Sequence, residues 1–230
     1  MIYNMTVKPR GNAETARRSI LIVDDHPIVR EGLAKVINSE GDLFISGEAW
    51  DLPSIDAAIK EERPDLIILD VSLSSTSGLD LISVLNAREN APPILVLSMH
   101  DEALYAERTI RLGAKGYINK GKPTSTLLAA IRKVLEGLYY VSDPVIYKVF
   151  SRMSEKEDEV SVSEIEKLSD RELQVLEMIG QGMGTHQIAD NLCLSMKTIQ
   201  TYQQRTKEKL ALKNINDLIR YAGLWVNDNV

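Results

Sequence analysis

The stretch Ile20-Leu21-Ile22-Val23-Asp24-Asp25-His26-Pro27 places four aliphatic residues directly before two adjacent carboxylates. Such a run of apolar, mostly β-branched residues is typical of a short strand that is covered on both faces, as in a parallel sheet. Two neighbouring carboxylates repel each other, and burying their charge is costly unless a cation or a hydrogen-bond donor compensates it. The stretch therefore predicts a buried strand that ends at a site where two negative charges are required.

The same alternation of apolar runs and helical periodicity continues to about residue 138. We expect strands at residues 20–23, 44–49, 66–69, 94–97 and 116–118. We expect helices at residues 28–39, 52–60, 79–88, 104–112 and 127–136. Five strand–helix repeats predict an α/β fold with a parallel, doubly wound, five-stranded sheet.

The carboxyl ends of these strands carry the polar residues, and in a doubly wound sheet ligands bind at that edge. The first strand ends at Asp24 and Asp25, and the third ends at Asp70. The fourth ends at Ser98, and Lys120 follows the fifth. Three carboxylates suit Mg²⁺, whereas an ammonium and a hydroxyl suit a phosphoryl group. These residues together predict a site that holds Mg²⁺ beside a phosphoryl acceptor.

After residue 168 the pattern is entirely helical. Ser169 and Glu172 have capping-box spacing, and Thr185 and Ser195 are expected to cap the next two helices. These two helices, joined by Cys193-Leu194, predict a helix-turn-helix. A final amphipathic helix over residues 216–225, with Leu218, Ala222 and Trp225, is either a dimer surface or part of the core.

Composition sets the class of protein. Of 230 residues, 44% are hydrophobic and 26% charged, as in ordinary globular proteins, and no apolar run approaches the length of a membrane span. A single cysteine and a polar N-terminus favour the cytoplasm. The net charge of −6 argues against nucleic-acid binding, but residues 195–213 hold five Lys or Arg against one Glu. This local positive charge is typical of a helix that enters a DNA groove.

Residues 19–138 resemble the receiver domain of bacterial two-component response regulators, a flavodoxin-like fold. The resemblance lies in Val23–Pro27, Pro64–Asp70, Ser98 and Gly116–Lys120. It implies that Asp70 accepts a phosphoryl group from a sensor histidine kinase or a small phosphodonor. The implied Mg²⁺ ligands are Asp24 through water, Asp25, Asp70 and the backbone carbonyl of Ser72. The implied phosphoryl-binding and switch residues are Ser98, Lys120 and Tyr117, with Ser98 and Tyr117 moving inward on phosphorylation.

One departure and two alternatives bear on this interpretation. Where the family usually has Met-Pro, this chain has Leu73-Ser74, which leaves open a receiver that acts as an unphosphorylated dimerisation module of a transcription factor. An aspartyl-phosphate phosphatase of the haloacid dehalogenase type would need a carboxylate two residues after the nucleophile, and Ser72 occupies that position. We therefore do not expect a conventional enzyme.

The C-terminal part resembles the four-helix DNA-binding domain of the LuxR/FixJ type. The matching residues are Leu168–Glu172, Gln187–Ala189, Leu194–Ile199 and Lys209-Leu210. The implied base-reading residues are Gln200, Thr201 and Gln204. The implied phosphate contacts are Lys197, Thr198, Arg205, Lys207 and Lys209.

Both parts together resemble the NarL/FixJ class of response regulators, which implies a phosphorylation-controlled transcription factor that binds double-stranded DNA as a homodimer. The expected division is an N-terminal extension (1–18), a receiver domain (19–138), a linker (139–167) and a helix-turn-helix domain (168–230).

Overall fold

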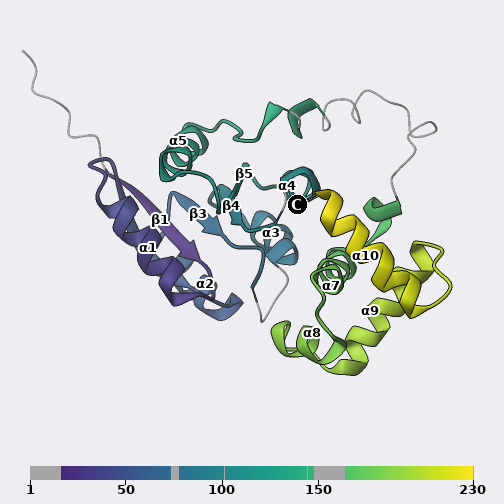
Figure 1. Ribbon diagram of the computed structural model, residues 1–230. Coiled ribbons are helices and arrows are strands. Elements are labelled where there is room, and N and C mark those ends of the chain that lie inside the picture. Colours follow the sequence, from purple (N-terminus) through teal and green to yellow (C-terminus); the bar gives the residue numbers. More distant parts are fainter. Residues whose placement is uncertain (1–16, 74–77, 101, 144, 148–163, 230) are drawn as a thin grey trace, which may run out of the picture.

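The computed structural model describes residues 17–73, 78–100, 102–143, 145–147 and 164–229, which form an α/β part followed by a helical part (Figure 1). The strands are β1 (Arg18–Val23), β2 (Leu43–Ala49), β3 (Leu66–Leu69), β4 (Ile94–Ser98) and β5 (Gly116–Asn119). The helices of the α/β part are α1 (Pro27–Asn38), α2 (Leu52–Glu62), α3 (Gly78–Asn86), α4 (Glu102–Arg111) and α5 (Thr124–Leu135). Each predicted strand and helix of this part is present.

The five strands form one parallel sheet in the order β2-β1-β3-β4-β5. The chain reverses its direction of travel across the sheet between β1 and β3, which is the switch point where doubly wound sheets bind ligands. The carboxyl ends of these two central strands are therefore neighbours. The expected flavodoxin-like, doubly wound fold is confirmed.

Side chains alternate between the two faces of the sheet, as the two-residue period of a strand requires. Ile20 and Ile68 pack with buried residues of α1 and α5, whereas Leu21 and Ile67 pack with buried residues of α2, α3 and α4. Both faces of the sheet are thus covered, which explains why the strands are continuously apolar.

The helical part consists of a short 3₁₀ turn and four α-helices. They are η1 (Glu164–Lys167), α7 (Asp170–Gly180), α8 (Thr185–Asn191), α9 (Met196–Lys209) and α10 (Ile215–Asn229). Gly180 allows α7 and α10 to pack closely, because a Cβ at this position would lie 2.5 Å from the carbonyl oxygen of Ala222. The predicted four-helix arrangement is confirmed.

The predicted helix caps are confirmed at two of three positions. The Ser169 hydroxyl accepts from the backbone N–H of Glu172, and the side-chain carboxylate of Glu172 accepts from the backbone N–H of Ser169 at 2.7 Å. Ser195 accepts from the N–H of Thr198 at 3.1 Å. Thr185 was wrong as a cap: it is the first residue of α8, and Gly184 precedes it, with its N–H donating to the side chain of Gln187.

The apolar residues of α10 mainly belong to the core. Leu218 and Ala222 are fully buried, so the interpretation of these two residues as a dimer surface was wrong. Ile219 and Leu224 are exposed, on a different part of the same helix.

Several expectations fall on residues outside the described ranges. These are most of the N-terminal extension, Ser74 of the Leu73-Ser74 departure and residues 148–163 of the expected linker. Among the described residues, no helix is long and apolar enough to cross a membrane.

Candidate functional sites

The carboxyl ends of β1 and β3 bring three aspartates together. Asp24, Asp25 and Asp70 offer carboxylate oxygens that lie within 4.8 Å of one another, together with a ring nitrogen of His26. The side chains of Asp24 and Asp70 are 2% exposed. Several carboxylates this close would repel one another strongly in a buried site unless cations were present.

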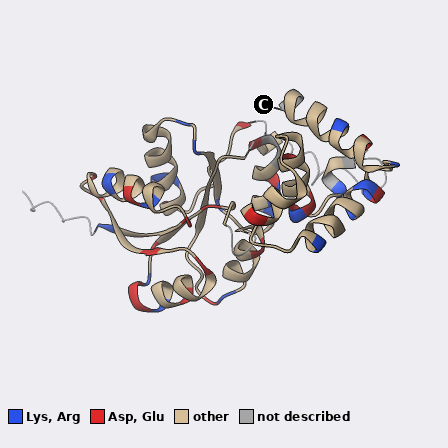
Figure 2. Ribbon diagram, turned by 60° about the horizontal axis from the view of Figure 1, so that its bottom comes forward, with Lys and Arg blue, Asp and Glu red and all other residues tan. Residues whose placement is uncertain are grey.

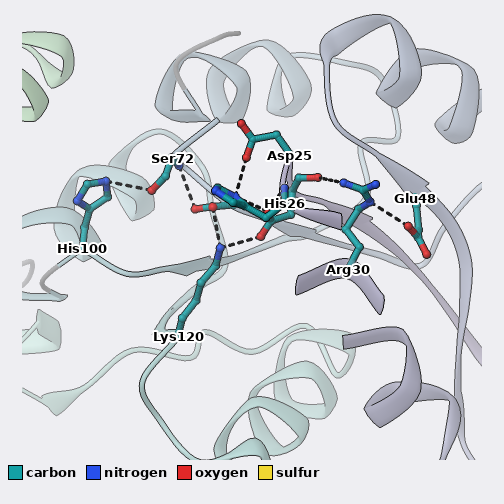
Figure 3. A network of polar contacts seen from close by, with 9 residues as sticks. Asp25, His26, Arg30, Glu48, Ser72, His100 and Lys120 are labelled. Atoms are coloured by element: carbon teal, nitrogen blue, oxygen red, sulfur yellow. Dashed lines mark hydrogen bonds and ion pairs between the residues drawn. The ribbon is translucent and has the colours of Figure 1, made fainter. Parts of the chain in front are cut away.

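Lys120 supplies one cation. Its Nζ lies 2.7 Å from a carboxylate oxygen of Asp24 and 2.7 Å from one of Asp70, between the two side chains (Figure 3). The backbone N–H of Lys120 donates to the carbonyl of Ser98 at 2.7 Å, which extends the β4–β5 pairing to the site. Burial lowers the pKa of Lys120, but the charges and hydrogen bonds of Asp70 and Asp24 outweigh it, so the pKa lies above its usual value. The ammonium is therefore charged throughout the physiological range.

The donor set of this site fits a small, hard divalent cation. Mg²⁺ is usually bound by one or two carboxylates, water and phosphate oxygens, and three carboxylates meet here beside an open edge. The N–H of Ser72 donates to Asp70 Oδ1 at 2.9 Å, so the loop after β3 is already folded back toward the carboxylate. Mg²⁺ held by Asp25, Asp70 and the Ser72 carbonyl, with Asp24 acting through water, would neutralise part of this charge.

His26 belongs to the acidic cluster as well as to the start of α1. It is the residue that precedes the helix, and its Nδ1 also lies 3.1 Å from Asp24 and 2.8 Å from Asp25. The sequence analysis assigned His26 no contact with the site. Its position directly after the two aspartates was the signal that could have indicated one.

Arg30, on α1, supports the cluster from outside. Its guanidinium donates to the carbonyl of Asp24 at 2.7 Å and to Glu48 at 2.9 Å (Figure 3). It also lies over the ring of Trp50, 5.5 Å from its centroid. The turn that carries Asp24 is thus held by a side chain anchored on β2.

The expected switch residues lie on β4 and β5, on the opposite side of Asp70 from Asp24 and β1. Ser98 is fully buried, and its Oγ accepts from the N–H of His100 at 3.3 Å. Tyr117 is 1% exposed, so it is already inside, and its hydroxyl donates to the carbonyl of His100 at 2.8 Å. His100 Nε2 also lies 3.1 Å from Ser72 Oγ (Figure 3). His100 was missed by the sequence analysis, because a single histidine after a strand carries no pattern.

The expected DNA-reading helix is α9, and its polar face is open. Gln200, Thr201 and Gln204 are exposed, and so are Lys197 and Arg205. Lys and Arg recur along the helices at the right of Figure 2, which include those of the C-terminal part. This face has the charge and exposure that a major groove requires.

Four of the expected DNA contacts also have partners inside the domain. One is Thr201, whose hydroxyl donates to the carbonyl of Lys197 at 2.9 Å. Lys209 pairs with the buried carboxylate of Glu172 at 2.7 Å, and Thr198 Oγ1 lies 2.8 Å from the capping hydroxyl of Ser195. The side-chain amide of Gln204 donates to Glu208 at 2.7 Å. Lys209 and Thr198 therefore help to hold the fold of the helix-turn-helix.

Cys193 occupies the turn between α8 and α9. Its φ of 51° lies in the left-handed region, and its side chain is exposed. Its thiol donates to the carbonyl of Asp190 at 3.8 Å.

Comparisons with known proteins agree with both parts of the structure. Residues 20–132 match the family model of the response regulator receiver domain, and residues 166–222 match that of the bacterial regulatory proteins of the luxR family.

Relatives match nearly the whole chain. The oxygen regulatory protein NreC of Staphylococcus haemolyticus is 34% identical over 207 residues, which is 88% of this chain and 95% of the relative. Its counterpart in Staphylococcus epidermidis is 35% identical over 208 residues, with the same coverage.

Among solved structures, a LuxR-family two-component response regulator from Aurantimonas is 28% identical with a TM-score of 0.54, covering 61% of this chain and 100% of that chain. The fold is also that of RcsB from Salmonella typhimurium, with a TM-score of 0.64 over 90% of this chain at 22% identity. The chain belongs to the two-component response regulators that join a receiver domain to a LuxR-type DNA-binding domain, the NarL/FixJ class. It is similar to NreC over 88% of its length, and its class is one of transcription regulators, not of conventional enzymes.

Proposed function

We propose that this regulator changes its action on DNA when Asp70 accepts a phosphoryl group from a sensor histidine kinase or a small phosphodonor. The observation that carries this proposal is the position of Lys120, which bridges Asp24 and Asp70 at 2.7 Å each at the switch point of the sheet. A fixed cation beside a carboxylate stabilises the charge that develops on transferred phosphoryl oxygens.

In the proposed reaction an Asp70 carboxylate oxygen attacks phosphorus. The new O–P bond forms as the bond from phosphorus to the donor's histidine nitrogen or acyl oxygen breaks, and the donor leaves with that electron pair. Lys120 holds the phosphoryl oxygens, and Mg²⁺, when bound at the acidic cluster, would supply further charge neutralisation. Ser98 turns its hydroxyl toward the product, since it is the buried hydroxyl on the neighbouring strand end.

For DNA, we propose that α9 enters the major groove. Gln200, Thr201 and Gln204 contact base edges, whereas Lys197, Arg205 and Lys207 contact phosphates. Two copies of the chain bind two half-sites as a homodimer, and the domain limits are 19–138 for the receiver and 168–230 for the DNA-binding domain.

The test of the phosphoryl acceptor is labelling with acetyl phosphate and Mg²⁺, measured as a gain in intact mass. The wild type should gain one phosphoryl group, and both Asp70→Asn and Asp25→Ala should gain none. Chelation of Mg²⁺ should abolish labelling of the wild type. Labelling of Asp70→Asn at another carboxylate would overturn the assignment, and no labelling of the wild type would favour the unphosphorylated dimerisation module instead.

A further inference from the structure

The receiver contacts the DNA-binding domain through a cluster of polar side chains centred on Glu177 of α7. His100 Nδ1 lies 2.8 Å from Glu177 Oε2, and the hydroxyl of Tyr105 donates to the same oxygen at 3.3 Å. The rings of His100 and Tyr105 stack with their centroids 4.3 Å apart. The His100 and Glu177 side chains are 14% and 18% exposed, so most of this pair is shielded from water.

A second anchor lies further along α4. Arg108 donates to the carbonyl oxygens of Leu168 and Ile165, at 2.9 and 3.1 Å, and pairs with Asp170 at 3.1 Å. Ile165 and Leu168 are buried, and they belong to the same contiguous apolar cluster as residues of the receiver. The two domains are thus joined by apolar packing as well as by polar contacts. We call His100, Tyr105 and Arg108, with Glu177, Asp170 and the carbonyls of Ile165 and Leu168, the interdomain clamp.

The clamp is also connected to the acidic site. The second ring nitrogen of His100 lies 3.1 Å from Ser72 Oγ, and the N–H of Ser72 donates to Asp70. The backbone of His100 contacts Ser98 Oγ through its N–H and the Tyr117 hydroxyl through its carbonyl. One residue therefore touches the loop after the phosphoacceptor, both expected switch residues and the DNA-binding domain.

The clamp leaves the recognition helix open. Each of its contacts in the DNA-binding domain lies on η1, on α7 or on the residues between them, and Figure 1 shows α7 on the side that faces α3 and α4, with α9 beyond it. Lys197, Gln200, Gln204 and Arg205 are exposed while the clamp is closed. A receiver in this position does not cover the residues that would meet DNA.

From these contacts we infer that the clamp fixes the direction of the DNA-binding domain without blocking it. The DNA-binding domain of one clamped chain can bind one half-site. The DNA-binding domains of two clamped chains, however, cannot orient themselves so that both bind adjacent half-sites. This inference rests on the proposed function only for the event that opens the clamp. In that event, Ser98 and the loop of Ser72 move toward a phosphoryl group on Asp70 and displace His100 from Glu177. The device thus controls pairing of domains on DNA, not access to DNA.

The first test measures the clamp without any phosphodonor. Cys193 and a cysteine introduced as Lys60→Cys on exposed α2 would carry a donor and an acceptor dye, and the interdomain distance distribution would be recorded for the full chain. We expect one narrow distribution in the wild type and a broad one in Glu177→Ala and in Arg108→Ala. Glu31→Ala, at an exposed position of α1, is the matched control and should behave as the wild type. Alanine is the best helix former, so these changes keep their helices.

The second test measures DNA binding of the same unphosphorylated proteins. The DNA would be a duplex selected from random sequences by the unphosphorylated chain, in a version with two half-sites and a version with one. Glu177→Ala should bind the two-site duplex about tenfold more tightly than the wild type, since a lost hydrogen bond to a charged group is of that order. Its affinity for the one-site duplex should equal that of the wild type.

Two outcomes would overturn the inference. An unchanged distance distribution in both Glu177→Ala and Arg108→Ala would show that no clamp holds the domains. An equal gain on both duplexes would show that the clamp blocks α9 itself. Neither measurement uses a phosphodonor, so these results are independent of the labelling of Asp70, which tests the proposed function.

Discussion

At the scale of single residues, Lys120 holds the acidic site together. Its ammonium lies between two carboxylates that are 2% exposed, and their charges keep its pKa above the usual value. Removal of one member of such a group leaves the others without compensation, which costs more than the net value of the interaction.

We therefore expect Lys120→Met to lower the free energy of unfolding by about 1–3 kcal/mol in the absence of divalent cations. Mg²⁺ should restore more stability to this variant than it adds to the wild type, because the ion then supplies the missing positive charge. Urea unfolding with and without Mg²⁺ measures both effects. Lys122→Met, at an exposed position two residues away, is the control and should change neither. A variant as stable as the wild type without Mg²⁺ would show that Asp24 and Asp70 do not need this cation.

Ser98 has a different expected role, since its hydroxyl is buried and contacts His100 rather than the carboxylates. Ser98→Ala should gain a phosphoryl group as the wild type does, but phosphorylation should then change its DNA affinity far less. Mass measurement of labelling and titration of DNA with both forms separate the two steps. A full response in Ser98→Ala would remove the hydroxyl from the coupling.

The residues that could be predicted from the sequence are those that follow a pattern. Asp24, Asp70, Ser98 and Lys120 each follow an apolar run, and a parallel sheet brings such ends to one edge whatever the details of packing. His100 and Glu177 follow no such rule. Their contact joins two domains and depends on how α4 meets α7, which no local spacing encodes.

At the scale of elements, α7 and α9 are joined by an ion pair between the buried carboxylate of Glu172 and the exposed ammonium of Lys209. Glu172 is 3% exposed, and it accepts from the Ser169 N–H and from Lys209. Burial raises the pKa of this carboxyl, but the hydrogen bonds of Lys209 and Ser169 outweigh it, so the pKa lies below its usual value. A carboxyl with a lowered pKa in the folded state stabilises the fold above its unfolded pKa, and this stability is lost as the pH falls through the folded pKa.

Glu172→Gln should therefore destabilise the DNA-binding domain by about 1–2 kcal/mol at pH 7, where the wild-type carboxylate is charged. The difference between variant and wild type should shrink as the pH falls below the ordinary pKa of glutamate. Urea unfolding in a Trp50→Phe background, followed by the fluorescence of Trp225 in α10 at pH 7 and in acid, checks this. Glu208→Gln on exposed α9 is the control. A difference independent of pH would mean that the charge of Glu172 is not what stabilises the domain.

Helix α9 offers two kinds of DNA contact, and substitutions at them should affect DNA binding in different ways. Glutamine can bond adenine N6 and N7 together, which is worth roughly 1–3 kcal/mol of discrimination, whereas a lysine on phosphate carries no sequence information. Gln200→Ala should thus relax preference at one base position per half-site and leave the salt dependence unchanged. Lys207→Ala should weaken binding to all sequences and reduce the log–log salt slope by about 0.9 per lost phosphate contact.

Affinities for single-base variants of a selected duplex, at several salt concentrations, distinguish the two. Loss of base preference in Lys207→Ala, with uniform weakening in Gln200→Ala, would mean that a different face of α9 enters the groove.

The element boundaries show where local rules suffice. Ser169 and Ser195 were predicted as caps because a side-chain oxygen directly before a helical period can accept a hydrogen bond from a free N–H of the first turn. At α8 the same rule selected Thr185, yet Gly184 precedes the helix, because the side chain of Gln187 satisfies the Gly184 N–H. Leu218 and Ala222 form an apolar stripe that, from the sequence, fits either a dimer surface or the core. The packing of α7 against α10 buries both residues and shows that they belong to the core.

At the scale of the whole molecule, the acidic site and the DNA-binding domain belong to one connected structure, and any coupling between their binding free energies must be the same in both directions. If a ligand at Asp70 raises DNA affinity by some factor, DNA must raise the affinity for that ligand by the same factor. Beryllium fluoride with Mg²⁺ is a suitable reversible phosphoryl analogue, because an equilibrium constant can be measured for it.

We expect the two factors to agree within error for the wild type. Asp70→Asn should show a factor of one in both directions, since the analogue needs the carboxylate. Titrations of the analogue with and without a selected duplex, and of the duplex with and without the analogue, complete the cycle. A wild type that binds the analogue but gives a factor of one in both titrations would show that the receiver does not control DNA binding.

The contact of Arg30 with Trp50 gives the acidic site an optical reporter of its own. A guanidinium over an indole alters its emission, and this same guanidinium holds the carbonyl of Asp24. Any ion or phosphoryl group that shifts the Asp24 turn must therefore change the brightness or colour of a half-exposed tryptophan. The chain has one other tryptophan, Trp225. In a Trp225→Phe variant, binding at the acidic site could be followed in real time by the intrinsic fluorescence of Trp50, with no dye attached.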